Sequence, residues 1–466
     1  MTRPPARPRV LFISYNALIE PLGPTQILPY VRGLAETCEM VVLSFEKRVR
    51  SPDEDAAETA AVAGVLADRG IRWIRLRYHK RPSLPATLFD ICRGVLRVVR
   101  EHRRQPFDLL HARGYVPAAI AGAVKQCTGV PFLFDIRGLQ ADEYADSGHW
   151  DPRGLKFRLT KRVEQALLRT ADGLVTLTHA VQPTLQTFAG LKQRATPPPS
   201  RVIPTCVDLD HFRFDPAARE RVRARLQVGD RPVLVYAGSI GGYYLLEEML
   251  DFYQTARDRW PGLFLLALVN GSPEAMAAAL AARRIAPEDY AVTWARHADM
   301  PAFLSAADAG LAFVRPSPAK RSASPTKCGE YLACGLPMVA SGGVGDVDEW
   351  LERTGAGALV TQHSRDAYAE AADRVRTLAT SANRDRFRAV AEAEFSTAGR
   401  ACPAYRQLYA EILRPRRYRG LFLTPYPPHC APSQRLKFEQ YYASFEEHDI
   451  EVVISPFVTS GLWPVL

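Results

Sequence analysis

The stretch SASPTKCGEYLACGLPMVAS, Ser322–Ser341, combines a polar turn, the start of a helix and a short apolar strand. Lys327 and Glu330 lie one turn apart in the expected helix. The first amides of a helix are unpaired and its dipole is positive at that end, so a lysine there favours a pyrophosphate. A carboxylate one turn further on can accept hydrogen bonds from a ribose diol. On spacing alone, an ordinary strand–loop–helix passage with a solvated lysine explains the stretch equally well.

The composition is typical of a soluble globular protein with more than one core. The chain has 466 residues, 47% of them hydrophobic and 24% charged, whereas a single core stops growing at roughly 250–300 residues. No run approaches the ~20 apolar residues of a membrane-spanning helix, and the Arg- and Pro-rich N-terminus lacks the apolar core of a signal peptide. The eight cysteines form no C-x-x-C pair. We therefore expect buried, reduced thiols in a cytoplasmic protein.

The net charge of +10 is confined to the first part of the chain. Residues 1–200 hold 29 Lys and Arg against 19 Asp and Glu, and the remainder is balanced. Peripheral contact with an anionic membrane, at its inner face, is one explanation. The solvated face of a strand is another, since Arg72, Arg75 and Arg77 alternate with apolar residues. No recognition motif or platform of stacking aromatic residues indicates a nucleic acid partner.

Short apolar strands alternate with helices along most of the chain. The first series of expected strands comprises Arg9–Ser14, Met40–Ser44, Ile71–Leu76, Asp108–His111, Phe132–Asp135 and one at Val202. The second comprises Val233–Ala237, Leu263–Leu268, Ala291–Trp294, Ala309–Phe313 and Met338–Ser341. The polar, Pro-rich segment Lys192–Ser200 lies between them and is expected to be a linker. The alternation predicts an α/β protein with two doubly wound parallel sheets.

A glycine-rich turn, Gly238–Gly242, follows the first strand of the second series and leads into a helix expected from Tyr243. Such a turn lets the backbone approach a phosphate closely. It matches neither the dinucleotide-binding fingerprint nor a P-loop, so the turn alone is a weak signal. It gains weight because this turn and the helix with Lys327 and Glu330 should lie at the same carboxyl edge of one sheet.

The glycine turn with its helix, Gly238–Met249, and the segment Ser324–Pro337 together resemble the donor-binding half of a GT-B glycosyltransferase of family four. Other segments that resemble this family are Asp108–Arg113, Phe134–Gly138, Val202–Asp208 and His297–Asp308. The resemblance covers about residues 9–413, and residues 324–341 are its most diagnostic part.

The resemblance implies two Rossmann-like domains that face each other across a cleft. Residues 1–195 would bind the acceptor, and residues 196–395 would bind a nucleoside-diphosphate sugar. A helix in residues 396–415 would cross back to the first domain. Transfer would retain the configuration of the anomeric carbon and would need no metal or other cofactor. The acceptor would be a glycan or a lipid-linked sugar in polysaccharide or cell-envelope biosynthesis.

The resemblance also assigns roles to single residues. Glu330 would hold the ribose, and Lys327 would face the diphosphate. The other expected donor-binding residues are Gly238, Ser239, Gly241, Gly242, Arg315, Ser322 and Thr326. His111 and Asp135 would join Lys327 as catalytic residues by positioning the acceptor hydroxyl, although a structural role for both stays open. The acceptor side of the cleft would also contain Gly23, Gln26, Arg113 and Arg137.

One position departs from the family pattern of two glutamates spaced eight residues apart, of which the first contacts the donor sugar. Eight residues before Glu330 stands Ser322. We hypothesise that a neutral hydroxyl there suits a deoxy, N-acetyl or otherwise modified sugar; strict preference for plain glucose or mannose in a donor panel would contradict this. The sequence Asp346-Val-Asp348 resembles a metal-binding D-x-D motif, but its place in a loop of a two-sheet chain argues against a metal.

The last segment, residues 416–466, repeats the first β-α-β unit of the chain. The loop Ala431–Gln434 echoes Gly23–Gln26, and it is followed by a helix from Leu436 and a strand at Ile450–Ser455. The segment looks like the truncated start of a second, similar glycosyltransferase, with a lone capping unit on the first enzyme as the alternative. About fifty residues cannot bury a doubly wound core, so we expect this partial β-α-β unit to dock loosely.

Two further function classes fit the same fold. A sugar-nucleotide epimerase or hydrolase would need an acid–base set acting on the donor, and none can be assembled from the sequence. A non-catalytic scaffold that binds sugar nucleotides is suggested by Ser322. Release of nucleotide only when an acceptor is present would distinguish transfer from both.

Overall fold

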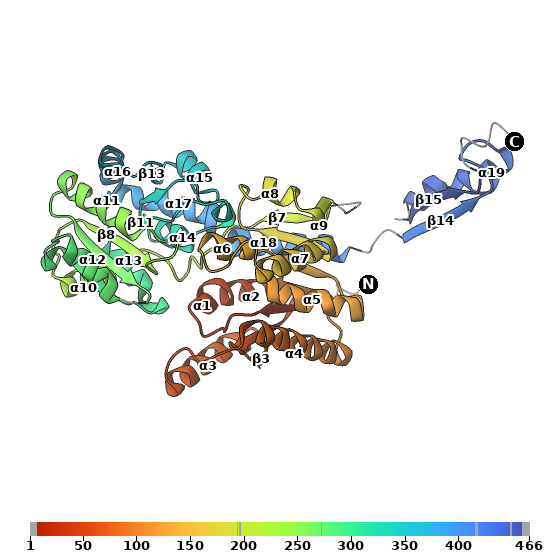
Figure 1. The fold of residues 1–466 in the computed structure, drawn as a ribbon, viewed down its shortest axis with the longest axis horizontal. Coiled ribbons are helices and arrows are strands. Elements are labelled where there is room, and N and C mark those ends of the chain that lie inside the picture. Colours follow the sequence, from red (N-terminus) through yellow and green to blue (C-terminus); the bar gives the residue numbers. More distant parts are fainter. Residues whose placement is uncertain are drawn as a thin grey trace. The chain divides into compact units, whose positions relative to one another are not determined.

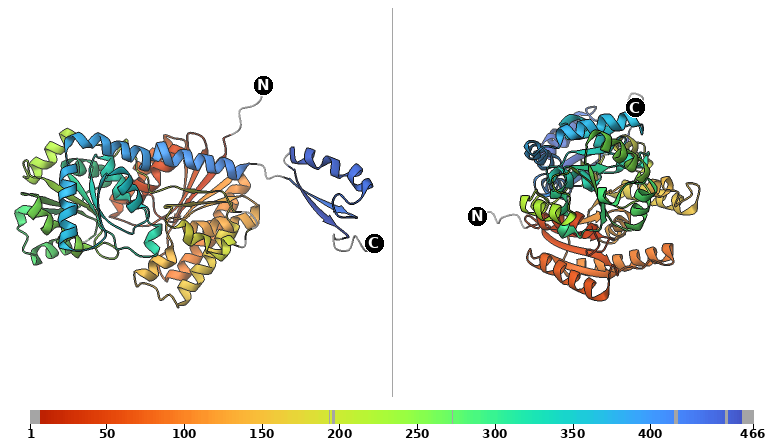
Figure 2. Two further views of the ribbon diagram at one scale, coloured as in Figure 1. Left: turned by 90° about the horizontal axis from the view of Figure 1, so that it is seen from above. Right: turned by 90° about the vertical axis from the view of Figure 1, so that its left-hand side faces the viewer.

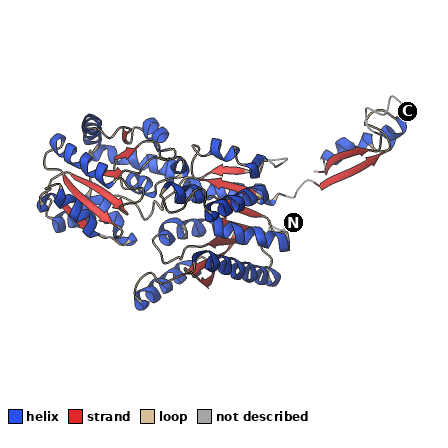
Figure 3. Cartoon of the chain, in the orientation of Figure 1, coloured by secondary structure: helices blue, strands red, loops and turns tan. Residues whose placement is uncertain are grey.

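The computed structural model describes residues 7–192, 194, 197–271, 273–414, 418–447 and 450–458. The chain forms two compact units, Met1–Ile412 and Leu413–Leu466. The larger unit contains two parallel sheets with helices on both faces (Figures 1 and 3). This confirms the expected fold class of two Rossmann-like domains. Among the residues that the structure describes, no helix has the length and apolar character needed to cross a lipid bilayer.

The first sheet has seven parallel strands in the order β3-β2-β1-β4-β5-β6-β7. They are β1 (Arg9–Ser14), β2 (Glu39–Glu46), β3 (Arg72–Arg77), β4 (Leu109–Arg113), β5 (Phe132–Asp135), β6 (Gly173–Thr176) and β7 (Ser200–Val202). The expected strands are therefore present. The short strand β6 was not among the expected ones. Because β7 pairs with β6, the first sheet continues past the domain boundary expected at residue 195.

Helices cover both faces of the first sheet. They are α1 (Leu22–Gln26), α2 (Leu28–Leu34), α3 (Pro52–Ala67), α4 (Ser83–Arg104), α5 (Tyr115–Thr128), α6 (Gln140–Asp146), α7 (Leu155–Thr170), α8 (Gln182–Gln186) and α9 (Ala189–Lys192). Residues from α4, α5 and α7 pack with alternate strand residues such as Leu11 and Ile13 in one buried cluster. The strand order reverses between β1 and β4, and ligands of such sheets bind beyond the carboxyl ends of the strands at this point.

The second sheet has six parallel strands in the order β10-β9-β8-β11-β12-β13. They are β8 (Val233–Gly238), β9 (Phe264–Val269), β10 (Tyr290–Thr293), β11 (Ala309–Ala312), β12 (Met338–Ser341) and β13 (Gly357–Val360). Alternate residues of β8 belong to different buried clusters, so both faces of this sheet are covered. The reversal point lies between β8 and β11, which places the loops after these two strands side by side.

The helices of the second domain are α10 (Pro216–Leu226), α11 (Leu246–Arg259), α12 (Pro273–Ala282), α13 (Met300–Ala306), α14 (Thr326–Ala333), α15 (Val347–Thr354), α16 (Arg365–Leu378) and α17 (Arg384–Phe395). Short turns are η1 (Pro287–Asp289), η2 (His297–Asp299), η3 (Ala319–Ser322) and η4 (Ser381–Asn383). A π-helical turn, η5 (Thr397–Ala401), joins α17 to α18 (Cys402–Leu413). Helix α18 lies against the first domain, where Arg406 donates to the Gly33 carbonyl at 2.6 Å (Figure 2, left).

The smaller unit has the β-α-β order expected from the repeat. Strands β14 (Tyr418–Thr424) and β15 (Ile450–Pro456) are parallel, and between them lie α19 (Pro432–Lys437), η6 (Glu439–Tyr441) and α20 (Tyr442–Glu447). The single helix expected from Leu436 is thus divided in two. The eight cysteines are unpaired; five are buried, but Cys92, Cys127 and Cys430 are exposed, contrary to the expectation that all would be buried.

Candidate functional site

Helix α14 lies beside the reversal point of the second sheet and carries Lys327 in its first turn and Glu330 one turn further on. Tyr331 fixes the helix in place. Its hydroxyl accepts a hydrogen bond from the Ala237 amide at 2.9 Å and donates one to the Leu311 carbonyl at 3.1 Å. Because these groups belong to β8 and β11, the first turn of α14 is held at the carboxyl ends of both strands.

The Lys327 ammonium is buried between two aromatic rings. It lies 4.3 Å from the centre of the Tyr236 ring and 4.6 Å from that of Tyr244. A Cβ atom on Gly238 would stand 2.9 Å from Nζ, so the ammonium reaches the glycine turn. Among the described residues Nζ has no hydrogen-bond partner. Burial lowers the pKa of Lys327 to about 8, against smaller opposing effects of Cys328 and Glu330.

Glu330 is also buried, with 9% of its surface exposed. No hydrogen bond or ion pair of its carboxylate is found within the described part of the chain. Burial raises the pKa of Glu330 to about 7, against the smaller opposing effect of Lys327. Buried polar groups are normally paired, so two unpaired ionisable groups at one helix end indicate a site that a ligand completes.

The glycine turn lies next to Lys327, but its geometry differs from the expectation. Helix α11 begins at Leu246 rather than at Tyr243, so its first amides do not directly follow the glycines. Gly241 and Gly242 are exposed. Their φ values of +80° and +62° lie in the left-handed region, which glycine adopts more easily than other residues. Half-buried Ser239 precedes them, and its carbonyl accepts a hydrogen bond from the Tyr236 hydroxyl.

Of the remaining expected donor-binding residues, two are accessible to solvent and one forms hydrogen bonds within the protein. Arg315 is exposed and Thr326 is half-buried at the start of α14. Ser322 is 3% exposed. Its hydroxyl donates to the Ala319 carbonyl at 2.6 Å and accepts from the Leu139 amide at 3.2 Å. Because Leu139 belongs to the first domain, this hydroxyl links the domains, which favours a structural role over the expected contact with a donor sugar.

In the first domain, Asp135 ends β5 and is fully buried among hydrogen-bond donors. The Tyr405 hydroxyl of α18 donates to its Oδ2 at 2.9 Å, and Arg113 donates to the same atom at 3.3 Å. Arg137 forms an ion pair with Oδ1 at 3.6 Å. Burial alone would raise the pKa of Asp135, but Arg137, His111 and Arg113 outweigh it and hold the pKa well below its usual range. Asp135 therefore stays ionised.

His111 lies beneath this cluster and is completely buried. Its Nδ1 is 2.5 Å from the Tyr409 hydroxyl and its Nε2 is 3.4 Å from Asp135 Oδ2. Both ring nitrogens are therefore occupied by protein groups. Burial lowers the pKa of His111. A neutral imidazole with two internal partners supports the cluster, so the structural alternative is favoured over contact with an acceptor.

The other expected acceptor residues do meet at the end of the first sheet. Gln26 Oε1 accepts a hydrogen bond from Arg113 and another from Arg137, each at 3.2 Å. Gln26 Nε2 donates to the Cys206 carbonyl at 3.2 Å. Gly23 lies in the same short helix as Gln26, α1, and a Cβ there would lie only 1.8 Å from the Leu18 carbonyl oxygen, so no other residue fits this position.

Several residues of the site were not predicted from the sequence. Thr205 accepts from Arg137 at 3.3 Å, and its amide donates to Ser324 Oγ at 3.0 Å, which links the first domain to the loop before α14. Tyr236, Tyr244, Tyr405 and Tyr409 are the aromatic residues around Lys327, Asp135 and His111. Tyr405 and Tyr409 are four residues apart on one helix, and this spacing is a signal that could have indicated a shared buried face.

The carboxylates of the Asp346-Val-Asp348 segment are both satisfied by backbone amides. Asp346 accepts from His179 at 2.7 Å and from Ala180 at 2.8 Å, across the domain boundary. Asp348 accepts from Gly343 at 2.9 and 3.0 Å. These contacts give both residues a loop-fixing role.

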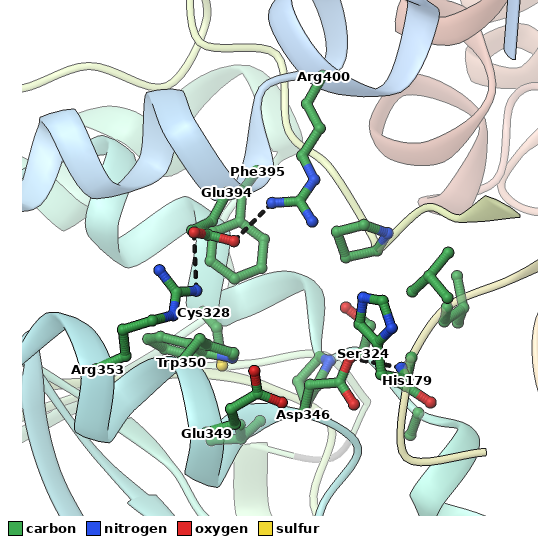
Figure 4. A pocket seen from close by; sticks show the side chains of 17 residues that line it. His179, Ser324, Cys328, Asp346, Glu349, Trp350, Arg353, Glu394, Phe395 and Arg400 are labelled. Carbon is green, nitrogen blue, oxygen red and sulfur yellow. Dashed lines mark hydrogen bonds and ion pairs between the residues drawn. The ribbon is translucent and has the colours of Figure 1, made fainter. Parts of the chain in front are cut away.

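A cavity of about 90 Å³ lies where the chain crosses between the domains. Figure 4 shows Glu394 between Arg353, at 2.9 Å, and Arg400, at 2.5 Å, with Trp350 beside them. Ser324, Pro325 and Cys328 also line it, whereas Lys327 and Glu330 do not. The cavity therefore borders the start of α14 on a side different from that of the two unpaired groups.

Two family models match consecutive parts of the chain. A glycosyl transferase 4-like domain matches residues 24–206, and glycosyl transferases group 1 match residues 231–377. No curated protein sequence is significantly similar to this chain.

Solved structures share the fold at low sequence identity. Sucrose-phosphate synthase from Thermosynechococcus elongatus is 18% identical with a TM-score of 0.62, over 87% of this chain and 100% of that one. HepE of Anabaena, in complex with UDP-glucose, is 15% identical with a TM-score of 0.62, over 86% and 99%. A glycosyltransferase from Rickettsia africae is 14% identical with a TM-score of 0.66, over 88% and 99%.

Proposed function

Because the chain belongs to the GT-B glycosyltransferases of the group 1, family-four type, we propose that it is a retaining enzyme that transfers a hexose-type sugar from a nucleoside diphosphate. The proposal rests on Lys327 and Glu330, which are both buried in α14, and on the Lys327 ammonium, which has no hydrogen-bond partner among the residues that the structure describes. A diphosphate supplies the missing counter-charge of the ammonium. A ribose diol supplies two donors for the carboxylate. The UDP-glucose bound to HepE supports a donor of this class.

The pKa values of Lys327 and Glu330 fit this assignment. With a pKa of about 8, Lys327 is mostly protonated at neutral pH, and a bound diphosphate would raise its pKa further. With a pKa of about 7, Glu330 is partly ionised, and ribose hydroxyl groups that donate to it would favour the carboxylate form. Donor binding is therefore expected to be tightest between about pH 7 and pH 8.

In the proposed reaction, the acceptor hydroxyl oxygen bonds to the anomeric carbon on the face from which the diphosphate departs. The bond between that carbon and the β-phosphate oxygen breaks, and the hydroxyl proton passes to the leaving diphosphate. Negative charge grows on the diphosphate in the transition state, so Lys327 and the exposed Arg315 would act most strongly there. We propose that these cations, rather than a metal ion, stabilise the leaving group.

We propose that the acceptor enters at the cluster of Gln26, Arg113 and Arg137 in the first domain. The three side chains form one hydrogen-bonded group at the reversal point of the sheet. Two guanidinium groups there suit an acceptor that carries phosphate, such as a lipid-linked sugar in envelope polysaccharide synthesis at the cytoplasmic side of a membrane.

Donor kinetics of two variants test the assignment. Glu330→Gln removes charge-assisted hydrogen bonds to the ribose, so we expect KM for the donor to rise roughly 10- to 100-fold. Lys327→Met removes a cation that acts on the leaving group, so we expect kcat to fall about 100-fold or more. The measurement is nucleotide release from a panel of nucleotide sugars, with and without lipid-linked acceptors.

Glu352→Gln is a matched control, because Glu352 is an exposed carboxylate on a different helix, α15. It should leave KM and kcat unchanged. Equal kinetics of wild type and both site variants would refute the assignment of Lys327 and Glu330. Nucleotide release that does not depend on an acceptor would instead indicate hydrolysis.

A further inference from the structure

Helix α4 exposes an apolar stripe along its outer face. Leu88 is 51% exposed, Phe89 53% and Leu96 71%. The opposite face, which includes Ala86 and Val98, is buried. Apolar residues on a surface helix normally face the core, so a helix with large apolar side chains on its solvent side as well indicates a second contact.

Helix α7 repeats this arrangement. Its exposed apolar residues are Leu155, Leu159 and Val163, and Leu155 is 74% exposed. The first turns of the two helices are adjacent, because Lys156 Nζ donates to Ser83 Oγ at 3.4 Å. Figure 1 shows α4, α5 and α7 on the same side of the first domain. We call this surface the α4–α7 face, defined by Leu84, Leu88, Phe89, Leu96, Leu155 and Leu159.

On these two helices the acidic side chains are buried, whereas several basic side chains are exposed. Their sequences contain ten Lys and Arg residues and three carboxylates. All three carboxylates, Asp90, Glu101 and Glu164, are at most 2% exposed and face internal partners. The outward charges of both helices are therefore positive, and Arg100, Arg103, Arg158 and Arg162 are among the exposed ones.

The α4–α7 face lies next to the edge where the acceptor cluster is found. Both helices begin on the carboxyl side of the first sheet, where β4 and β5 end in Arg113 and Asp135. The loop before α7 adds Trp150, whose ring stacks on Tyr144 at 4.6 Å. Aromatic side chains with a polar edge are enriched where proteins meet the headgroup region of a membrane.

We propose that the α4–α7 face docks the protein on an anionic lipid surface, with the leucines and Phe89 entering the headgroup boundary and the arginines contacting lipid phosphates. Exposed leucines beside outward cations, without outward carboxylates on the same helices, are the pattern of an interfacial amphipathic helix. The long arginine stems can lie along the apolar layer while their guanidinium groups reach the phosphates. This proposal rests on the proposed function and adds an anionic lipid surface as a partner of the enzyme. Docking on that surface does not depend on binding or turnover of the sugar donor.

Vesicle sedimentation of the full-length protein tests the docking. Wild type should bind vesicles of phosphatidylcholine with about a third phosphatidylglycerol, and binding should weaken with added salt and on phosphatidylcholine alone. Arg158→Ser with Arg162→Ser should weaken binding about 25-fold, since each basic residue near such a surface contributes roughly fivefold. Leu88→Ser with Leu96→Ser should weaken it about tenfold or more, because it removes the buried apolar area.

Trp294→Ser with Arg365→Ser is the matched control, because both residues are exposed on the second domain. This variant should bind like wild type. The thermal midpoint of each variant shows that it is folded. No binding of wild type to anionic vesicles would overturn the proposal, as would equal binding of the control and the α4–α7 variants.

A probe on Cys92 gives a second readout, because this exposed thiol lies in α4 between Leu88 and Leu96. In a Cys127→Ser, Cys430→Ser background, an environment-sensitive dye on Cys92 should shift to the blue on anionic vesicles. A shift that follows protein concentration without vesicles would mean that a second copy covers the face, and would overturn the proposal. Donor kinetics without vesicles should be unchanged in the α4–α7 variants, so failure of docking and failure of sugar transfer are distinguishable.

Discussion

Burial of Lys327 and Glu330 opposes folding, because desolvation disfavours the charged form of each side chain. Each is buried, and the Lys327 ammonium has no hydrogen-bond partner among the described residues. Their placement one turn apart was predictable, because a short motif and the helical period fix it. The rings of Tyr236 and Tyr244 were not predictable, since they come from a strand and a turn more than eighty residues earlier. Their position depends on the strand order of the sheet.

Lys327→Met should therefore stabilise the protein while it lowers kcat. The folded pKa of about 8 lies below the ordinary 10.5, so the folded protein holds this proton less tightly than the unfolded chain. Burial of the charged Lys327 therefore lowers the free energy of unfolding by about 3 kcal/mol. This loss of stability is fully present below about pH 8 and disappears as pH rises towards 10.5. Denaturant unfolding at pH 6.5 should show a variant more stable by up to that amount. A less stable variant would contradict the picture of an unpaired cation.

At the scale of elements, α14 is positioned by one tyrosine and one glycine. The Tyr331 hydroxyl bonds backbone groups of β8 and β11, and its ring packs where a Cβ on Gly310 would stand 2.4 Å from it. The sequence predicted the helix and its carboxylate but gave no sign that Tyr331 joins two strands. That contact arises only because β8 and β11, seventy residues apart, are neighbours at the reversal point of the sheet.

Tyr331→Phe should weaken both the fold and the site. It leaves the Ala237 amide and the Leu311 carbonyl without their buried partner, which costs about 1–3 kcal/mol. The helix start should then move relative to the glycine turn, so KM for the donor should rise with little change in kcat at saturation. Denaturant unfolding and donor kinetics measure the two effects. As a control, Tyr290→Phe changes a half-buried tyrosine in β10, for which the structure gives no side-chain hydrogen bond.

The C-terminal helix shows a similar division between what sequence can and cannot predict. A helix that returns to the first domain was expected, and α18 does contact it. What could not be foreseen is that Tyr405 and Tyr409 bond Asp135 and His111, about 270 to 300 residues earlier in the chain. These contacts change the interpretation of His111 from a candidate catalytic residue to a buried support of Asp135.

At the scale of the whole molecule, the repeat at the C-terminus allows one unit to be compared with the other. Leu421 and Leu423 of β14 occupy the positions of Leu11 and Ile13 in β1. The first pair is 62% and 59% exposed, whereas the second is fully buried. In the first domain, β1 pairs with β4 as well as β2, and helices such as α4 and α5 cover it. Within the described part of the smaller unit, β14 pairs with β15 alone. The same pattern of strand residues is thus part of a buried core in the first domain and of an exposed apolar surface in the smaller unit.

Removal of the smaller unit should therefore leave the enzyme intact. Both sheets and all the expected donor and acceptor residues belong to the unit that ends at Ile412. A chain that ends after Arg414 should keep the wild-type thermal midpoint, donor KM and kcat. It should also aggregate less, because an exposed apolar strand such as β14 favours pairing with other chains. Calorimetry, donor kinetics and light scattering measure these three properties.

Limited proteolysis of the full-length chain provides an independent test of the same idea. Part of the segment from Arg414 to Gly420 lies outside the described residues, but its arginines offer trypsin several sites. A two-stranded unit that cannot bury Leu421 and Leu423 protects the segment that joins it to the larger unit only weakly. Cleavage in that segment should therefore precede cleavage within the larger unit. Resistance of this segment, or a lower thermal midpoint after truncation, would instead mean that the unit caps the first enzyme. The corresponding prediction for Leu421→Ser is a gain in solubility without loss of donor turnover.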